Sequence, residues 1–79
     1  MPTTDEIETR VKEIIREQVG GSRELNANTS LANDLAADSL TVTEIIMETE
    51  ERFELRIPNA AVEKIRTVGD LISYVQANA

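Results

Sequence analysis

The sequence contains no cysteine and no histidine. The absence of cysteine excludes disulfides and thiolate metal sites, and the absence of histidine excludes a Ser-His-Asp catalytic triad. Aromatic residues are almost as scarce, because Phe53 and Tyr74 are the only two. Any hydrophobic core must therefore be built mainly from leucine, isoleucine, valine and methionine.

Long hydrophobic runs are absent as well. No segment approaches the roughly 20 consecutive apolar residues of a membrane-spanning helix, so we expect no membrane span. The first ten residues, MPTTDEIETR, are acidic and lack the apolar stretch of a secretory signal. These features together favour a cytoplasmic protein.

Basic residues are outnumbered, with 8 Lys and Arg against 15 Asp and Glu, for a net charge of −7. This balance argues against nucleic acid as a partner, since phosphate backbones are bound by Lys and Arg. The charge is also uneven: residues 34–54 hold seven acids and one base, a net of −6, which leaves −1 for the rest. Such a segment is typical of a surface that binds basic partners. It is also typical of a solvated helix face that keeps a protein soluble.

The length of 79 residues and the 41% hydrophobic content predict one domain, residues 1–79, with a single core. A domain of this size buries only about 60% of the surface of its unfolded chain, so its stability should be modest. We expect a monomer.

The N-terminal segment carries the signals of an amphipathic helix that begins after Thr3. Thr3 and Glu6 have the spacing of a capping box, and Gly20 and Gly21 supply a stop. Its apolar residues fall at helical spacing and form one stripe: Ile7, Val11, Ile14, Ile15 and Val19.

Residues 21–37 form a long connection rich in serine, asparagine and threonine. Leu25, Leu31 and Leu35 recur along it, so we expect it to cross the surface of the core and to be pinned there. Its NANTS segment is similar to part of a calcium loop. Leu31 occupies the position where the sharp turn of that loop requires glycine, so a calcium site is excluded.

A second helix is predicted from Ser39 to Phe53. Its buried side should consist of Val42, Ile46, Thr49 and Phe53, flanked by Leu40 and Ile45. A second stripe, at the helical spacing i, i+3, i+4 and i+7, must face elsewhere: Glu44, Met47, Glu48 and Glu51. An apolar residue among acids has two explanations. Met47 either wraps over the edge of the core or offers an apolar contact to a partner.

The last third of the chain predicts two more helices. Ile57-Pro58 breaks the chain, because proline disfavours a helical residue before it, and NAAVEKI is long enough only for a short helix. Thr67, with Asp70 three residues on, caps a final helix whose apolar side includes Val68 and Leu71. The fold class is therefore all-α: a small four-helix bundle of three main helices and one short helix, with a long loop between the first two.

Ser39 is the residue with the most distinctive chemical setting. It lies in the first turn of the second helix, where unpaired backbone N–H groups and the helix dipole favour anions such as phosphate. The simpler interpretation is that Asp38 or Ser39 is only the helix cap. A serine–lysine pair would have to recruit Lys12 or Lys64 from another helix, so we expect no enzymatic activity.

Asp38-Ser39-Leu40, opening a helix with acids on its outer face, resembles the signature of acyl carrier proteins. Phe53 stands fourteen residues after the serine, and Ile57-Pro58 follows four residues later. The resemblance extends over nearly the whole chain and includes further matching positions: Leu35, the stretch from Glu44 to Met47, Glu50-Glu51, Glu63-Lys64-Ile65 and Thr67-Val68.

The resemblance implies that Ser39 carries 4′-phosphopantetheine, transferred from coenzyme A by a separate phosphopantetheinyl transferase. The arm ends in a thiol that holds acyl groups as thioesters for partner enzymes of fatty acid, lipid or polyketide biosynthesis. These partners, which load and process the acyl group, should carry basic docking patches. The implied recognition residues are Asp38, Leu40, Glu44, Met47, Glu48 and Glu51. An aliphatic interior that includes Ile46, Ile57 and Val62 would shelter the acyl chain.

The chain departs from the pattern of this family at several positions. It has Ala36 where glycine is typical and Thr41 where an acid is typical, and acids that commonly follow Ile-Pro are absent from Asn59-Ala60-Ala61. Glu48 and Thr49 replace a small apolar pair. These departures favour a specialised carrier at least as much as the housekeeping carrier of fatty acid synthesis.

Two alternatives stay open at the level of sequence. Peptidyl carriers commonly have paired glycines before the serine, and Ala36-Ala37-Asp38 lacks them, so an acyl cargo is preferred to an aminoacyl one. An acidic helical adaptor without any arm would use the same face.

Overall fold

The computed structural model describes residues 3–20, 24–33 and 38–78, and the secondary-structure elements within these ranges are helices joined by turns and loops. The helices are α1 (Thr4–Val19), α2 (Ser39–Phe53), α3 (Asn59–Val62) and α4 (Val68–Asn78). In the described part of the chain the only β-type pairing is an isolated bridge between Ser30 and Thr67. The predicted all-α bundle of three main helices and one short helix is thus confirmed, and α2 has the predicted bounds.

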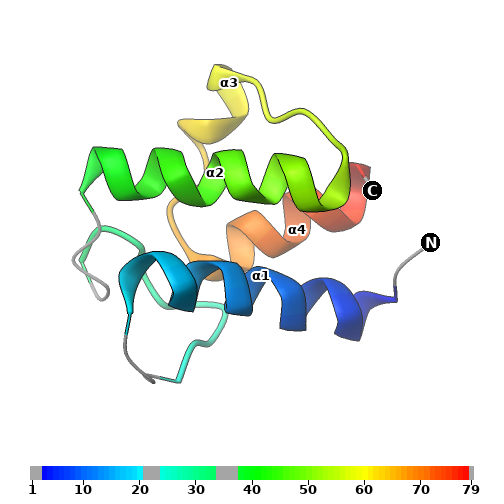
Figure 1. Ribbon diagram of the computed structural model, residues 1–79, viewed down its shortest axis with the longest axis horizontal. Coiled ribbons are helices and arrows are strands. Elements are labelled where there is room, and N and C mark those ends of the chain that lie inside the picture. The colour runs from blue at the N-terminus through cyan, green and yellow to red at the C-terminus, as the bar shows by residue number, and fades with distance from the viewer. Residues whose placement is uncertain (1–2, 21–23, 34–37, 79) are drawn as a thin grey trace.

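The three main helices pack with α1 in contact with both α2 and α4. Figure 1 shows α1 and α2 running in opposite directions, with α4 behind them and α3 above α2. Thr3 caps α1, because its side chain accepts a hydrogen bond from the Glu6 N–H at 3.2 Å. At the other end of α1, Gly20 has a φ of 77° and donates its N–H to the Arg16 carbonyl at 2.8 Å. Glycine suits this backbone because it has no Cβ to clash.

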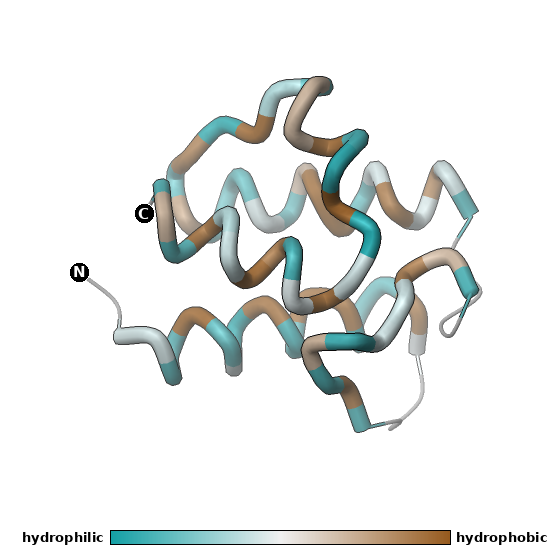
Figure 2. Tube along the Cα trace, turned by 180° about the vertical axis from the view of Figure 1, so that it is seen from behind, coloured by the Kyte–Doolittle hydropathy of each residue, from teal (hydrophilic) through white to brown (hydrophobic). Residues whose placement is uncertain are grey.

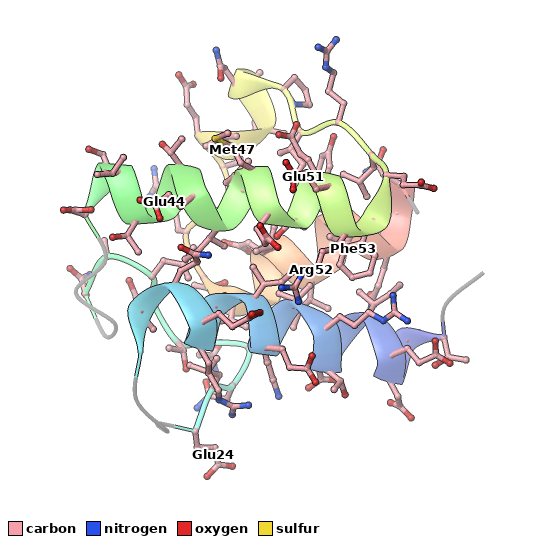
Figure 3. All side chains as sticks on the ribbon, viewed as in Figure 1. Glu24, Glu44, Met47, Glu51, Arg52 and Phe53 are labelled. Carbon is pink, nitrogen blue, oxygen red and sulfur yellow. The ribbon has the colours of Figure 1, made fainter. Side chains whose placement is uncertain are left out.

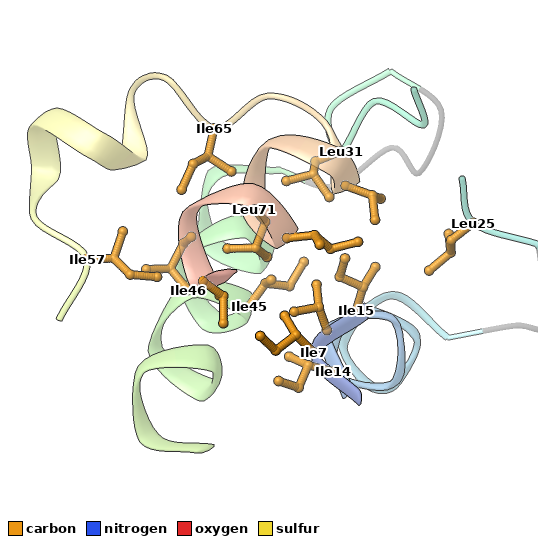
Figure 4. Close-up of a cluster of buried hydrophobic side chains, with 14 residues drawn as sticks. Ile7, Ile14, Ile15, Leu25, Leu31, Ile45, Ile46, Ile57, Ile65 and Leu71 are labelled. Atoms are coloured by element: carbon orange, nitrogen blue, oxygen red, sulfur yellow. The ribbon is translucent and has the colours of Figure 1, made fainter. Parts of the chain in front are cut away.

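The core is aliphatic, as the scarcity of aromatics predicts. Figure 4 shows the buried side chains converging from all three main helices and from the connection. Phe53 and Tyr74 are only partly buried and pack against the edge of the core. Figure 2 shows hydrophobic and hydrophilic segments alternating around the turns of α1 and α4, as expected of helices with one buried side. The buried hydrophobic residues are Ile7, Val11, Ile14, Ile15, Leu25, Leu31, Ile45, Ile46, Ile57, Ile65, Val68, Leu71, Ile72 and Val75.

The connection between α1 and α2 is pinned to the N-terminus of α4. Leu25 and Leu31 are buried, as expected of leucines that anchor a loop, and the predicted third anchor, Leu35, lies outside the described residues. Three backbone hydrogen bonds complete the docking: Leu31 N–H to the Arg66 carbonyl at 3.1 Å, Val68 N–H to the Thr29 carbonyl at 3.0 Å, and Gly69 N–H to the Ala27 carbonyl at 3.0 Å. They satisfy peptide groups that would otherwise cost free energy when removed from water.

The approach is close at Gly69. A Cβ built on this residue would lie 2.8 Å from the Ala27 carbonyl oxygen, so any other residue here would force the two segments to shift. The second predicted cap is also present: the Asp70 N–H donates to Thr67 Oγ1 at 3.1 Å, and the Asp70 carboxylate accepts the Thr67 N–H at 3.1 Å. An aspartate therefore performs the role that glutamate has in the usual capping box.

One side chain of α2, Leu40, differs from the expected pattern, whereas Thr49 is buried as expected. Leu40, expected beside the buried side, is 66% exposed. Thr49 lies fully inside the core, and its hydroxyl donates to the Ile45 carbonyl of its own helix at 2.7 Å. That hydrogen bond satisfies the hydroxyl without a partner from another element, which is why a polar side chain is tolerated there.

Candidate functional site

Ser39 is the first residue of α2, and Asp38 is the residue that caps the helix. The Asp38 carboxylate accepts a hydrogen bond from the Thr41 N–H at 2.8 Å, and the Asp38 carbonyl accepts one from the Val42 N–H at 3.0 Å. The side chain of Ser39 is exposed. Of the two candidates for the cap, Asp38 takes the role, and the Ser39 hydroxyl is left accessible from solvent.

The electrostatics of this terminus favour an anion. The hydrogen bond from the Thr41 backbone is the main cause that lowers the pKa of Asp38 below 3.8, so the cap is a carboxylate at neutral pH. The first turn of α2 contains no acidic residue beyond the cap. The positive end of the helix dipole therefore acts on a group bound at the Ser39 oxygen, opposed only by the charge of the Asp38 cap within that turn.

The outer face of α2 combines apolar and acidic side chains. Residues of a helix are separated by roughly 100°, which places Leu40, Met47, Glu44 and Glu51 close together on the side away from the core. Leu40 is 66% and Met47 56% exposed, and Glu44 and Glu51 are exposed as well. Figure 3 shows the last three spread along α2. Met47 thus offers most of its side chain to solvent, which favours the partner contact over packing on the core.

Glu48 is placed differently from the other predicted recognition residues. One of its carboxylate oxygens accepts a hydrogen bond from Arg52 Nε at 2.9 Å, and Arg52 Nη2 also contacts Glu17 of α1 at 2.8 Å. The bonds to Glu48 and then Glu17 raise the pKa of Arg52, which stays charged. Figure 3 shows Arg52 between α2 and α1. The spacing rule gave Glu48 the same face as Glu44. The same rule places Arg52, four residues later, within reach of Glu48, but only the fold brings Glu17 to Arg52.

A small pocket of about 160 Å³ opens between α2 and α3, on the side of α2 that carries Ser39. It begins one turn after the serine, at Thr43, and includes the three residues that the resemblance implied for sheltering an acyl chain. Polar residues also reach it, which the sequence pattern did not indicate. The Glu50 carboxylate there accepts the Ile57 N–H at 2.8 Å. The lining residues are Thr43, Ile46, Met47, Glu50, Ile57, Asn59 and Val62.

Other kinds of site find no support in the described residues. Among them, no group of three or more His, Cys, Asp or Glu side chains could hold a metal ion. No helix in this part of the chain is long and apolar enough to cross a membrane. Lys12, one of two lysines considered as a partner for Ser39, instead pairs with Glu8 of its own helix at 2.8 Å.

Comparisons with known proteins agree with this geometry. Residues 9–75 match the model of the family described as "Phosphopantetheine attachment site". The acyl carrier proteins of Chlamydia caviae and Chlamydia felis are each 48% identical over 71 residues, covering 89% of this chain and 92% and 91% of theirs.

Solved structures give the same result for the fold. A putative acyl carrier protein from Mycobacterium tuberculosis superposes with a TM-score of 0.87 at 31% identity, covering 90% of this chain and 96% of that one. The acyl carrier protein of Enterococcus faecalis gives a TM-score of 0.83 at 30% identity, covering 99% and 100%.

The residues of this chain fit the prosthetic group of that family, because an exposed serine hydroxyl stands at the electropositive end of a helix. The group is a covalently attached 4′-phosphopantetheine, and the role it gives the protein is that of a carrier of acyl groups. With 67 of its 79 residues matched by the family model and near-complete coverage of its relatives, this chain belongs to the acyl carrier protein family.

Proposed function

We propose that Ser39 is the residue to which the arm is attached. The observation that carries this proposal is its position: it lies within the matched segment, at the first residue of α2, with an exposed side chain. Asp38 supports the role by capping the helix itself, so the serine hydroxyl is not needed as a cap. A phosphodiester at this oxygen would lie in the favourable field of the helix terminus.

The residues that this chain lacks indicate which chemical groups the attached arm must supply. It has no cysteine and no histidine, so the thiol that bears the acyl group is supplied by the attached arm. The residues of the chain orient the arm at the end of α2 and offer the outer face of the helix to partners. We infer that the chain does not itself catalyse acyl chemistry.

The partners are a phosphopantetheinyl transferase and enzymes that load and process acyl groups. The exposed carboxylates of Glu44 and Glu51 lie on either side of Met47, and Leu40 is exposed one turn before Glu44. The complementary surface therefore combines basic groups with an apolar contact. Asp38 adds a charge beside the attachment point. We expect the protein to act as a monomer in the cytoplasm.

The pocket between α2 and α3 is the place where we expect the acyl chain to shelter. It opens on the side of Ser39, and Ile46, Ile57 and Val62 supply its apolar lining. Burial of an acyl chain there would remove apolar surface from water. A holo protein loaded with an acyl group should therefore unfold at a higher temperature than the unloaded holo protein.

The attachment is tested by incubating the purified protein with coenzyme A and a broad-specificity phosphopantetheinyl transferase and measuring the intact mass. We expect the mass to rise by one phosphopantetheine group. The Ser39→Ala variant should show no increase, whereas Ser73→Ala, which removes another exposed serine, should be modified like the wild type. Modification of Ser39→Ala would overturn the assignment. Turnover of a thioester by the unmodified protein would contradict the purely carrier role.

A further inference from the structure

Arg52 holds together two acids from different helices. Its Nη2 lies 2.8 Å and 3.1 Å from the two carboxylate oxygens of Glu17 in α1, while its Nε lies 2.9 Å from Glu48 in α2. The side chains of Arg52 and Glu48 are only 34% and 32% exposed, against 53% for Glu17. This three-residue cluster, here called the Arg52 clasp, carries a net charge of −1.

Resting on the proposed docking role of α2, we propose that the Arg52 clasp determines which carboxylates a partner contacts. A cation that approaches Glu48 must compete with a guanidinium already bonded to it, and it is also repelled by that guanidinium. Glu44 and Glu51 have no such neighbour among their described contacts. The partner therefore binds Glu44 and Glu51, and Glu48 contributes little.

The geometry of α2 specifies the charges and the apolar surface that such a partner must have. Glu44 and Glu51 are seven residues apart, which corresponds to about 10 Å along the helix. Met47 lies between them, and Leu40 lies one turn before Glu44, both with more than half of their side chains exposed. The fitting partner is a protein surface with two cationic groups about 10 Å apart, on either side of an apolar patch.

The clasp can be tested by a double-mutant cycle between Glu48→Gln and Arg52→Gln. The readout is kcat/KM of a phosphopantetheinyl transferase for the protein at low ionic strength, where charge effects are least screened. In the wild-type background we expect Glu48→Gln to change kcat/KM less than Glu44→Gln and Glu51→Gln do. In the Arg52→Gln background, Glu48→Gln should lower it by about two- to five-fold, the range that one exposed ion pair produces.

The matched control for net charge is Arg56→Gln. Arg56 is also exposed and its removal changes the charge by the same amount, but it forms no part of the clasp. Arg52→Gln should raise kcat/KM more than Arg56→Gln does. If Glu48→Gln has the same effect in both backgrounds, the clasp does not mask Glu48 and the proposal is overturned. A purely structural role for Arg52 would lower the stability of the Arg52→Gln variant without changing the effect of Glu48→Gln.

A second measurement separates this proposal from that on Ser39. The same variants, each carrying Ser39→Ala, are titrated with an oligolysine peptide and followed by fluorescence anisotropy. Loss of affinity on Glu48→Gln only in the absence of Arg52 supports the clasp, whether or not the wild type accepts an arm. Equal losses with and without Arg52 overturn it. Failure of the wild type to be modified contradicts the role of Ser39 alone.

Discussion

The first turn of α2 and the connection at residues 24–33 are both polar segments, yet they are held in place by different means. The start of α2 is fixed by bonds within five residues, such as those from Thr41 to Asp38 and from Thr43 to the Ser39 carbonyl. The connection is fixed by bonds to residues far along the chain, such as that between Gly69 and Ala27. Removing a buried anchor of the connection should therefore cost the fold more stability than altering an exposed side chain of the attachment region.

The largest effect that this difference predicts is for leucines. Leu31 is 2% exposed in the connection and Leu40 is 66% exposed beside Ser39. Leu31→Ala should lower the free energy of unfolding by about 2–5 kcal/mol, because it leaves a cavity in the core. Leu40→Ala should change it by less than about 0.5 kcal/mol. Urea unfolding followed by circular dichroism measures both, and equal losses for the two variants would abolish the distinction.

A smaller effect is expected at Gly69, where the connection meets α4. Gly69→Ala places a Cβ about 2.8 Å from a backbone oxygen of Ala27, so the segment must shift. Alanine has a better helix propensity than glycine by about 1 kcal/mol, which offsets part of the cost of this shift. We expect a net loss of about 1 kcal/mol in the free energy of unfolding. Gln76→Ala, at an exposed position of the same helix, is the control. A rise in melting temperature for Gly69→Ala would show that the docking contact is not tight.

The cap of α2 should contribute about as much to the free energy of unfolding as the contact at Gly69 does. Its effect on stability can be measured separately from its effect on modification. Asp38→Ala removes the acceptor for the Thr41 N–H and should lower the free energy of unfolding by about 1 kcal/mol. Asp38→Asn retains an acceptor and loses the charge, so its stability should stay near that of the wild type. Thermal unfolding reports the cap, and the rate of Ser39 modification reports the charge. If the two variants lose equal stability, the hydrogen bond to Thr41 is not what stabilises the terminus.

The smallest effect concerns the pH dependence of the cap on α4. Hydrogen bonds from the Arg66 backbone and then the Thr67 backbone lower the pKa of Asp70 below 3.8. A carboxyl group with a lowered folded pKa stabilises the fold above its ordinary pKa of 3.8, and this contribution is lost as the pH falls through the lower folded value. The stability difference between wild type and Asp70→Asn should thus be greatest near neutral pH and shrink in acid. A difference independent of pH would contradict this assignment.

The sequence predicted the helices of this fold with little error. Helix starts at Thr3, Asp38 and Thr67 depend on hydrogen bonds to residues three positions ahead, so they can be identified from a short window. The resemblance of Asp38-Ser39-Leu40 and its surroundings to acyl carrier proteins implied the candidate attachment residue and the face around it. The exposure of Leu40 was not predicted, because it was grouped with the buried side as an apolar residue, although helical spacing places it with Glu44 and Met47.

Local contacts therefore determined from sequence alone where each helix begins, which side of it is buried and where the candidate serine stands. Only the tertiary structure decided that the connection docks on α4, that Arg52 of α2 pairs with Glu17 of α1, and that polar residues line the pocket between α2 and α3. These features join residues separated by up to 42 positions, such as Gly69 and Ala27. These residues meet because of the way whole helices pack against one another. The hydrophobic periodicity of a single helix carries no information about that packing.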